Sequence, residues 1–178
     1  MSDRREFVKF VSMGAAFAGA TALVNAQQPG GTSPTASAQT ATQGTAPAKP
    51  PALDRDMVKE FVIAGHNDLD KVKAMLTKEP GLLNAAWDWG GGDFEMAIGG
   101  AGHMGRPDIA NYLISQGGRF DIFVAAMLGR IDIVRNALTA FPYLAQSKGP
   151  HGIPLIVHAK KGGDNAAEVV AFLESLKS

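Results

Sequence analysis

Apolar side chains recur at spacings of three and four residues along most of the chain after residue 53. Such spacing places them on one face of an α-helix. The apolar runs are short and come in pairs, and each pair is joined by a tight turn. Four pairs are expected, at residues 57–64 with 68–77, 96–104 with 107–116, 121–141 around a turn at 129, and 154–161 with 164–176. The pattern therefore predicts an all-α domain built from helical hairpins.

Turn-forming residues separate the two helices of each expected pair. Glycine and asparagine tolerate the left-handed backbone conformation that such turns use. Pro107 suits the first position of its helix, where a missing N–H costs no hydrogen bond. Asp164 is expected to cap the last helix. The expected turn residues are Asn67, Gly105, Gly129 and Gly162, and the successive spacings between them are 38, 24 and 33 residues. The uneven spacing predicts an enlarged segment after the first pair and a shortened one after the second.

Residues of the third and fourth pairs follow a repeat pattern. Ala125-Ala126, Gly129 and Ile133-Val134 match its middle, and Ile153-Pro154-Leu155 stands at its start. The hairpins resemble ankyrin repeats, whose pattern is roughly T-P-L-H-x-A-A-x-x-G-x-x-x-I-V-x-x-L-L and whose period is about 33 residues. The resemblance covers most of the chain from residue 55 to 176. It implies an ankyrin-like helical-hairpin repeat solenoid of about four repeats, with a concave groove that binds other proteins.

The first 26 residues have the pattern of an export signal. A charged start precedes an uncharged run rich in alanine and glycine at residues 10–24, and a signal peptidase would cut after Ala26. Charged, apolar and small regions in this order are typical of a secretory signal. The charged region resembles a bacterial twin-arginine signal. The residues that carry this resemblance are Arg4, Arg5, Phe7 and Lys9.

The export signal sets the expected location and the division of the chain. The resemblance implies a periplasmic or secreted protein that meets the membrane only during export; a plain secretory signal and an uncleaved anchor helix are the alternatives. Residues 27–52 are rich in Pro, Gly, Ser, Thr, Ala and Gln and contain no aromatic or large aliphatic side chain. Such a segment is expected to be a disordered linker. The repeat domain then occupies residues 53–178.

Composition excludes several classes of function. The 17 basic and 17 acidic residues cancel, and binding to a nucleic-acid backbone needs a basic excess or stripe. No nucleic-acid partner is therefore expected. The chain has no cysteine, which rules out a disulfide framework, a thiolate zinc site and a cysteine nucleophile. No cofactor is expected.

The segment between the first two pairs is the first unusual feature. It contains both tryptophans, Trp87 and Trp89, followed by three glycines and Asp93. Indole rings beside a flexible glycine run are typical of a binding surface. The alternative is that the tryptophans pack over the enlarged loop, that the glycines form a turn and that Asp93 caps the next helix.

The four histidines form no metal-binding motif. His103 and His151 are the better functional candidates, since ankyrin-like stacks place their positions at the groove. His66 is expected to be solvated at its turn, and His158 to be buried and hydrogen-bonded. The glycines of the G-x-G-x-x-G match at residues 100–105 are expected to let helices approach closely rather than to bind a nucleotide, because they lie late in a helix and at its turn, whereas a nucleotide site needs a helix that opens on them.

These observations lead to one favoured function and one alternative. The favoured function is an exported, non-enzymatic scaffold that binds an unknown protein or peptide in its groove and irregular loops. The alternative is a periplasmic protein or small enzyme that binds a small ligand or a metal in the same groove; it requires His103 and His151 to lie close together. The candidate contact residues are Trp87, Trp89, Asp93, His103 and His151. No metal ligand is assigned.

Overall fold

The computed structural model describes residues 49–176 and shows a domain of eight α-helices. The residues of the predicted export signal, including Arg4, Arg5 and Ala26, lie outside the described residues. The helices are α1 (Arg55–Gly65), α2 (Leu69–Lys78), α3 (Ala97–Met104), α4 (Pro107–Ser115), α5 (Ile122–Met127), α6 (Ile131–Ala140), α7 (Leu155–Lys161) and α8 (Ala167–Ser175). The predicted predominance of helix is confirmed, and the expected pairs of helices are present.

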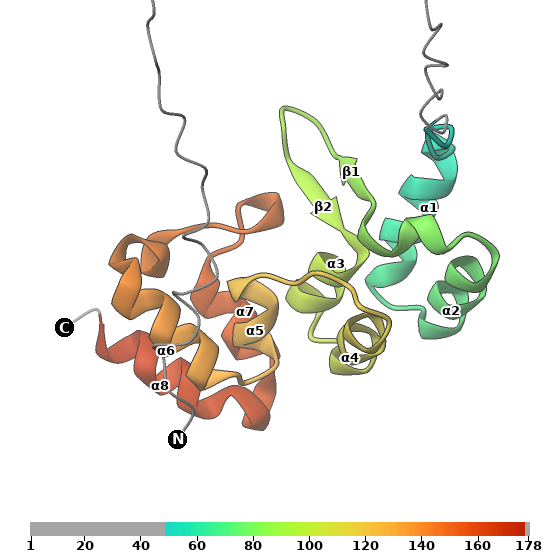
Figure 1. The fold of residues 1–178 in the computed structure, drawn as a ribbon. Helices are drawn as coiled ribbons and strands as arrows, with labels where there is room; N and C mark the ends of the chain where they lie inside the picture. The colour runs from blue at the N-terminus through green and yellow to red at the C-terminus, as the bar shows by residue number, and fades with distance from the viewer. Residues whose placement is uncertain (1–48, 177–178) are drawn as a thin grey trace, which may run out of the picture. The chain divides into compact units, whose positions relative to one another are not determined.

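Contacts between the helices follow their order along the chain. Each odd-numbered helix packs against the even-numbered helix that follows it. The odd-numbered helices also contact one another in sequence, α1 with α3, α3 with α5, and α5 with α7 (Figure 1). The odd-numbered helices therefore form an inner layer in which neighbours far apart in the sequence lie side by side.

The buried apolar residues form two clusters along this row. The first gathers side chains of α1 to α4 around Phe61 and Leu113. The second gathers side chains of α5 to α8 around Leu138 and Leu155. Helix α5 contributes to both. A pocket of about 390 Å³ opens where α4 adjoins the turn before α6.

A small β-hairpin interrupts the helices. Strand β1 (Ala86–Asp88) pairs antiparallel with β2 (Phe94–Met96), and Figure 1 shows the hairpin projecting from the row of helices. Its tip contains the run of three glycines, all with positive φ, which confirms a turn there. The prediction that Asp93 caps the next helix is wrong. Met96 holds that position, because the hairpin continues the extended backbone up to the start of α3.

Short 3₁₀ helices occur in the segments that follow α2, α6 and α7. They are η2 (Pro80–Asn84), η3 (Pro142–Gln146), η4 (Pro150–Gly152) and η5 (Gly163–Ala166). The prediction that Asp164 caps the last helix is wrong, because η5 takes up this residue and α8 begins only after Ala166. A β-bridge between Lys148 and Pro154 closes the loop that contains η4.

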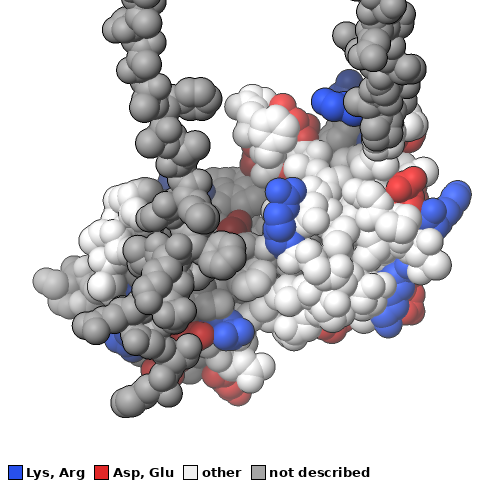
Figure 2. All heavy atoms as spheres, in the orientation of Figure 1, with Lys and Arg blue, Asp and Glu red and all other residues white. Residues whose placement is uncertain are grey.

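Among residues 49–176, no helix combines the length and the apolar character that crossing a membrane requires. On the face that Figure 2 shows, Lys and Arg are scattered among Asp and Glu and form no basic stripe.

Candidate metal centre

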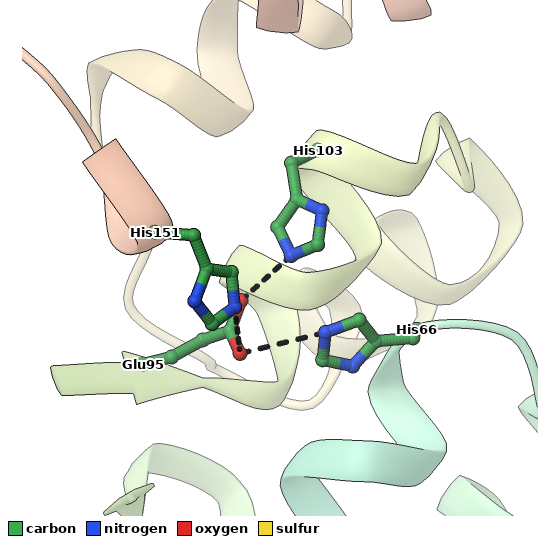
Figure 3. A group of neighbouring side chains, drawn as sticks. All are labelled: His66, Glu95, His103 and His151. Carbon is green, nitrogen blue, oxygen red and sulfur yellow. Dashed lines mark hydrogen bonds and ion pairs between the residues drawn. The ribbon is translucent and has the colours of Figure 1, made fainter. Parts of the chain in front are cut away.

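Four side chains from separate segments converge beside the inner layer of helices. His66 follows the end of α1, Glu95 is the middle residue of β2, His103 lies in the last turn of α3, and His151 lies in η4. Each offers one ligand atom, and these four atoms all lie within 4.8 Å of one another (Figure 3). We call these four residues the His–Glu cluster.

Glu95 is the centre of the cluster, and its side chain is 0% exposed. Its Oε1 lies 2.8 Å from Nε2 of His103. Its Oε2 lies 3.5 Å from Nε2 of His66 and 3.3 Å from Nε2 of His151. Burial on its own would raise the pKa of the carboxyl. The hydrogen bonds from His103 and Trp89, with the nearby His66, outweigh burial and hold the pKa of this group below its ordinary value.

His66 is held by a backbone hydrogen bond. Its Nδ1 lies 2.9 Å from the carbonyl oxygen of Val62. A carbonyl only accepts, so Nδ1 has the proton and Nε2 of the neutral ring keeps a free lone pair that faces Glu95. The ring fits because Gly100 has no side chain: a Cβ there would lie 2.7 Å from Nδ1. The expectation that His66 is solvated is wrong, since its side chain is 20% exposed and faces the cluster.

His151 is oriented by Asp93. One carboxylate oxygen of Asp93 accepts the backbone N–H of His151, and the other lies 2.9 Å from its Nδ1. The Nδ1 proton therefore points to Asp93, and Nε2 is left facing Glu95. His151 has φ 58, a left-handed conformation that non-glycine residues seldom adopt. Residues held in such conformations concentrate at functional sites.

Trp89 covers the cluster from the tip of the hairpin. Its Nε1 donates to Oε2 of Glu95 at 2.8 Å, and its ring lies 5.7 Å from that of His151 and 6.5 Å from that of His66. Trp87 is not part of the cluster. Its partly buried ring packs on the first apolar cluster and lies beneath two basic side chains, those of Arg55 and Lys59.

His158 packs behind the cluster without joining it. It is buried as predicted, and its Nδ1 bonds to the carbonyl oxygen of Pro154. Its Nε2 has no hydrogen-bond partner among the described residues. The ring contacts those of Phe123 and His103. Burial lowers the pKa of His158 below its ordinary value, and the bond to Pro154 only partly opposes this effect.

The donor set suits a divalent transition metal. Imidazole nitrogens with a carboxylate bind zinc, copper, nickel or iron. With bonds of about 2.1 Å, the ligand atoms of a tetrahedral site stand ~3.4 Å apart, so small side-chain movements would bring the four atoms onto one ion. In metal sites, a hydrogen bond to the second ring nitrogen fixes the tautomer of a metal-binding histidine. The contacts of Val62 to His66 and of Asp93 to His151 are of this kind.

The structure brings together most of the residues that the sequence analysis singled out. The ring centroids of His103 and His151 lie 5.3 Å apart. The alternative function, binding of a small ligand or a metal, required these two residues to lie close together. Trp89 and Asp93 flank them. The sequence analysis missed Glu95. Its place between Phe94 and Met96, before a run of apolar residues, indicates a buried acid, and a buried charge needs a partner.

The chain was compared with known proteins. No protein-family model, no curated protein and no solved structure matches it. The function proposed below therefore rests on the residues of the His–Glu cluster and their surroundings.

Proposed function

We propose that this protein binds a divalent transition-metal ion through His66, Glu95, His103 and His151. The observation that carries the proposal is the approach of their four ligand atoms to within 4.8 Å of one another. Metal binding belongs to the alternative function that the sequence analysis kept open. The scaffold function stays a prediction, and four of its five candidate contact residues lie in or against the cluster.

The charge of the cluster supports this function. Glu95 is buried yet favours the ionised form, and an isolated buried carboxylate is costly unless a cation or hydrogen bonds compensate it. When its three imidazoles are neutral, as metal binding requires, the cluster has a net charge of −1. This charge and the nitrogen donors together favour a divalent cation.

Metal binding would displace the proton that His103 now shares with Glu95. Nε2 of His103 donates to Oε1 in the metal-free cluster, and this nitrogen must lose its proton before it can bind a metal. The affinity for metal is therefore expected to rise with pH.

Titration of full-length protein purified without a histidine tag tests the proposal. Zn²⁺, Cu²⁺, Ni²⁺ and Co²⁺ are added separately after treatment with a chelator and followed by calorimetry. We expect a single ion per chain. Loss of an outer hydrogen bond lowers metal affinity by about 10- to 100-fold. Glu95→Gln and His103→Gln each remove a proposed ligand and should weaken binding by more than this. Co²⁺ absorption reports the coordination geometry.

Glu174→Gln is the matched control, because Glu174 is an exposed acid on α8 that pairs with Lys160 and lies outside the His–Glu cluster. Binding that stays equal in Glu95→Gln, His103→Gln and the control would refute the site. So would the absence of stoichiometric binding for every ion in the series.

We also infer that the helical pairs form an ankyrin-like stack in an exported protein. The contacts of α1 with α3, α3 with α5 and α5 with α7 support stacking, as do the left-handed glycines Gly105 and Gly129 at the turns within two pairs. The arginine pair at residues 4 and 5 supports export. An experimental structure tests the stack by the superposition of its four pairs.

A further inference from the structure

A second pocket, of about 480 Å³, opens beside the His–Glu cluster. Phe94 and Met96 of β2 line it, whereas Glu95 between them points the other way, as the alternation of a strand requires. Ile98 and Phe123 extend the apolar lining. The volume is in the range of sites that hold small molecules. Phe94 is 63% exposed, so an apolar ligand would cover a ring that water now contacts.

The charged side chains in this pocket are unequally engaged. The acidic ones have internal partners: Asp93 uses both oxygens on His151, and Asp121 caps α5 by accepting from the N–H groups of residues 123 and 124. The basic ones are Arg119 and Lys148. Neither basic side chain has a hydrogen-bond or ion-pair partner within residues 49–176. The charged side chains of the pocket that have no such partner are therefore the two basic ones.

The pocket is built from the departures from a regular repeat. Phe94 comes from the inserted hairpin, Arg119 from the short segment before α5, and Lys148 from the loop closed by its bridge to Pro154. These three segments are also the ones that differ most from the ankyrin pattern. The three segments therefore meet at this pocket.

We propose that this pocket binds a small organic anion, a carboxylate attached to a flat apolar group. Arg119 and Lys148 would donate charge-assisted hydrogen bonds to the carboxylate. Phe94, Met96 and Phe123 would contact the apolar body. The ligand does not need the metal ion, because no residue of the His–Glu cluster lines the pocket.

Benzoate serves as the probe, and benzyl alcohol as its neutral counterpart of similar shape. Each is titrated into ¹⁵N-labelled, chelator-treated full-length protein and followed by amide chemical shifts. Benzoate should produce saturable shifts around Phe94, Arg119 and Phe123, and benzyl alcohol should produce none at the same concentrations. Arg119→Gln and Lys148→Gln should each weaken benzoate binding by about tenfold.

Lys78→Gln is the matched control, since Lys78 ends α2 and lies outside the pocket lining; it should bind benzoate like the unchanged protein. Equal binding of the two probes would overturn the proposal. Unchanged benzoate affinity in both Arg119→Gln and Lys148→Gln, or the absence of saturable shifts, would do the same. Because the protein is metal-free throughout, the result is independent of the metal titrations.

Discussion

At the scale of single residues, two adjacent glycines of α3 have different surroundings. A Cβ on Gly100 would meet the ring of His66 at 2.7 Å, closer than such contacts occur. A Cβ on Gly99 would lie 3.5 Å from Cγ of Glu95, an ordinary van der Waals distance. The lack of a side chain at Gly100 therefore leaves room for the ring of His66, a proposed metal ligand, whereas the lack of one at Gly99 does not affect that ring.

Gly100→Ala should impair metal binding without unfolding the protein. The new methyl group displaces the His66 ring and breaks its bond to Val62, so metal affinity is expected to fall by about 10- to 100-fold. Alanine favours a helix over glycine by up to ~1 kcal/mol, so thermal stability should be retained. Gly99→Ala is the control and should bind like the unchanged protein. Calorimetric affinities that are equal for the two variants would show that His66 is not a ligand.

His158 should make the stability of the metal-free protein depend on pH. Its pKa in the folded protein is lowered by burial, below the value of about 6.5 in an unfolded chain. The unfolded chain therefore takes up a proton that the folded protein excludes. The stability contributed by neutral His158 is complete above about pH 6.5 and declines as pH falls toward the lowered pKa.

His158→Leu should remove this decline. Urea unfolding at pH 7 and pH 5 should show a smaller loss of unfolding free energy in the variant, by up to about 1.4 kcal/mol per pH unit. Pro154 O keeps its backbone donors in the variant, so no acceptor is left unpaired. Glu95 titrates below this window because its pKa is lowered from 4.5. Equal losses in the two proteins would show that His158 does not titrate differently on folding.

At the scale of elements, the hairpin and the η4 loop act on each other across the cluster. Asp93 ends the hairpin tip, and both of its oxygens bond to His151 in η4. This pair joins segments 58 residues apart. Through this pair, Asp93 orients His151, a proposed metal ligand, without being a ligand itself.

Asp93→Asn should therefore lower metal affinity by about 10- to 100-fold, the usual cost of losing an outer hydrogen bond. The amide can still accept the backbone N–H of His151, but it loses the charge that holds Nδ1–H. Asp88→Asn, in the same hairpin, keeps an acceptor for the N–H groups of Gly90 and Gly92 and serves as the control. An affinity of Asp93→Asn equal to that of the control would show that the Asp93–His151 contact is only structural.

At the scale of the whole molecule, local patterns predicted the helices and could not predict the cluster. The helix pairs follow from apolar spacing and turn residues such as Gly129, which depend on near neighbours. The cluster joins His66 and His151 across 85 residues, and such proximity depends on the stacking of three pairs. Asp164 was misplaced for a different, local reason: a 3₁₀ turn includes this residue, so the last helix begins after it.

The proposed export concerns the whole chain and is tested at the arginine pair. Replacing Arg4 and Arg5 together by lysine should block export if a twin-arginine pathway recognises them. Fractionation of bacteria that express the chain should then show uncleaved protein in the cytoplasm, whereas the unchanged protein should start at Gln27 outside it. Export of the double variant at the normal rate would favour a plain secretory signal.

The division of the apolar core into two clusters bears on which parts of the domain unfold locally. Helix α5 contributes Val124 to the first cluster and Ala125 to the second, and α3 also contacts α7, so these helices join the two sides of the core. Backbone amides on the two sides should exchange hydrogen for deuterium with different free energies of opening. Three of the proposed metal ligands belong to the first side, and His151 to the second. A bound ion would link the two sides of the core. Mass spectrometry should then show backbone amides on both sides exchanging hydrogen for deuterium together.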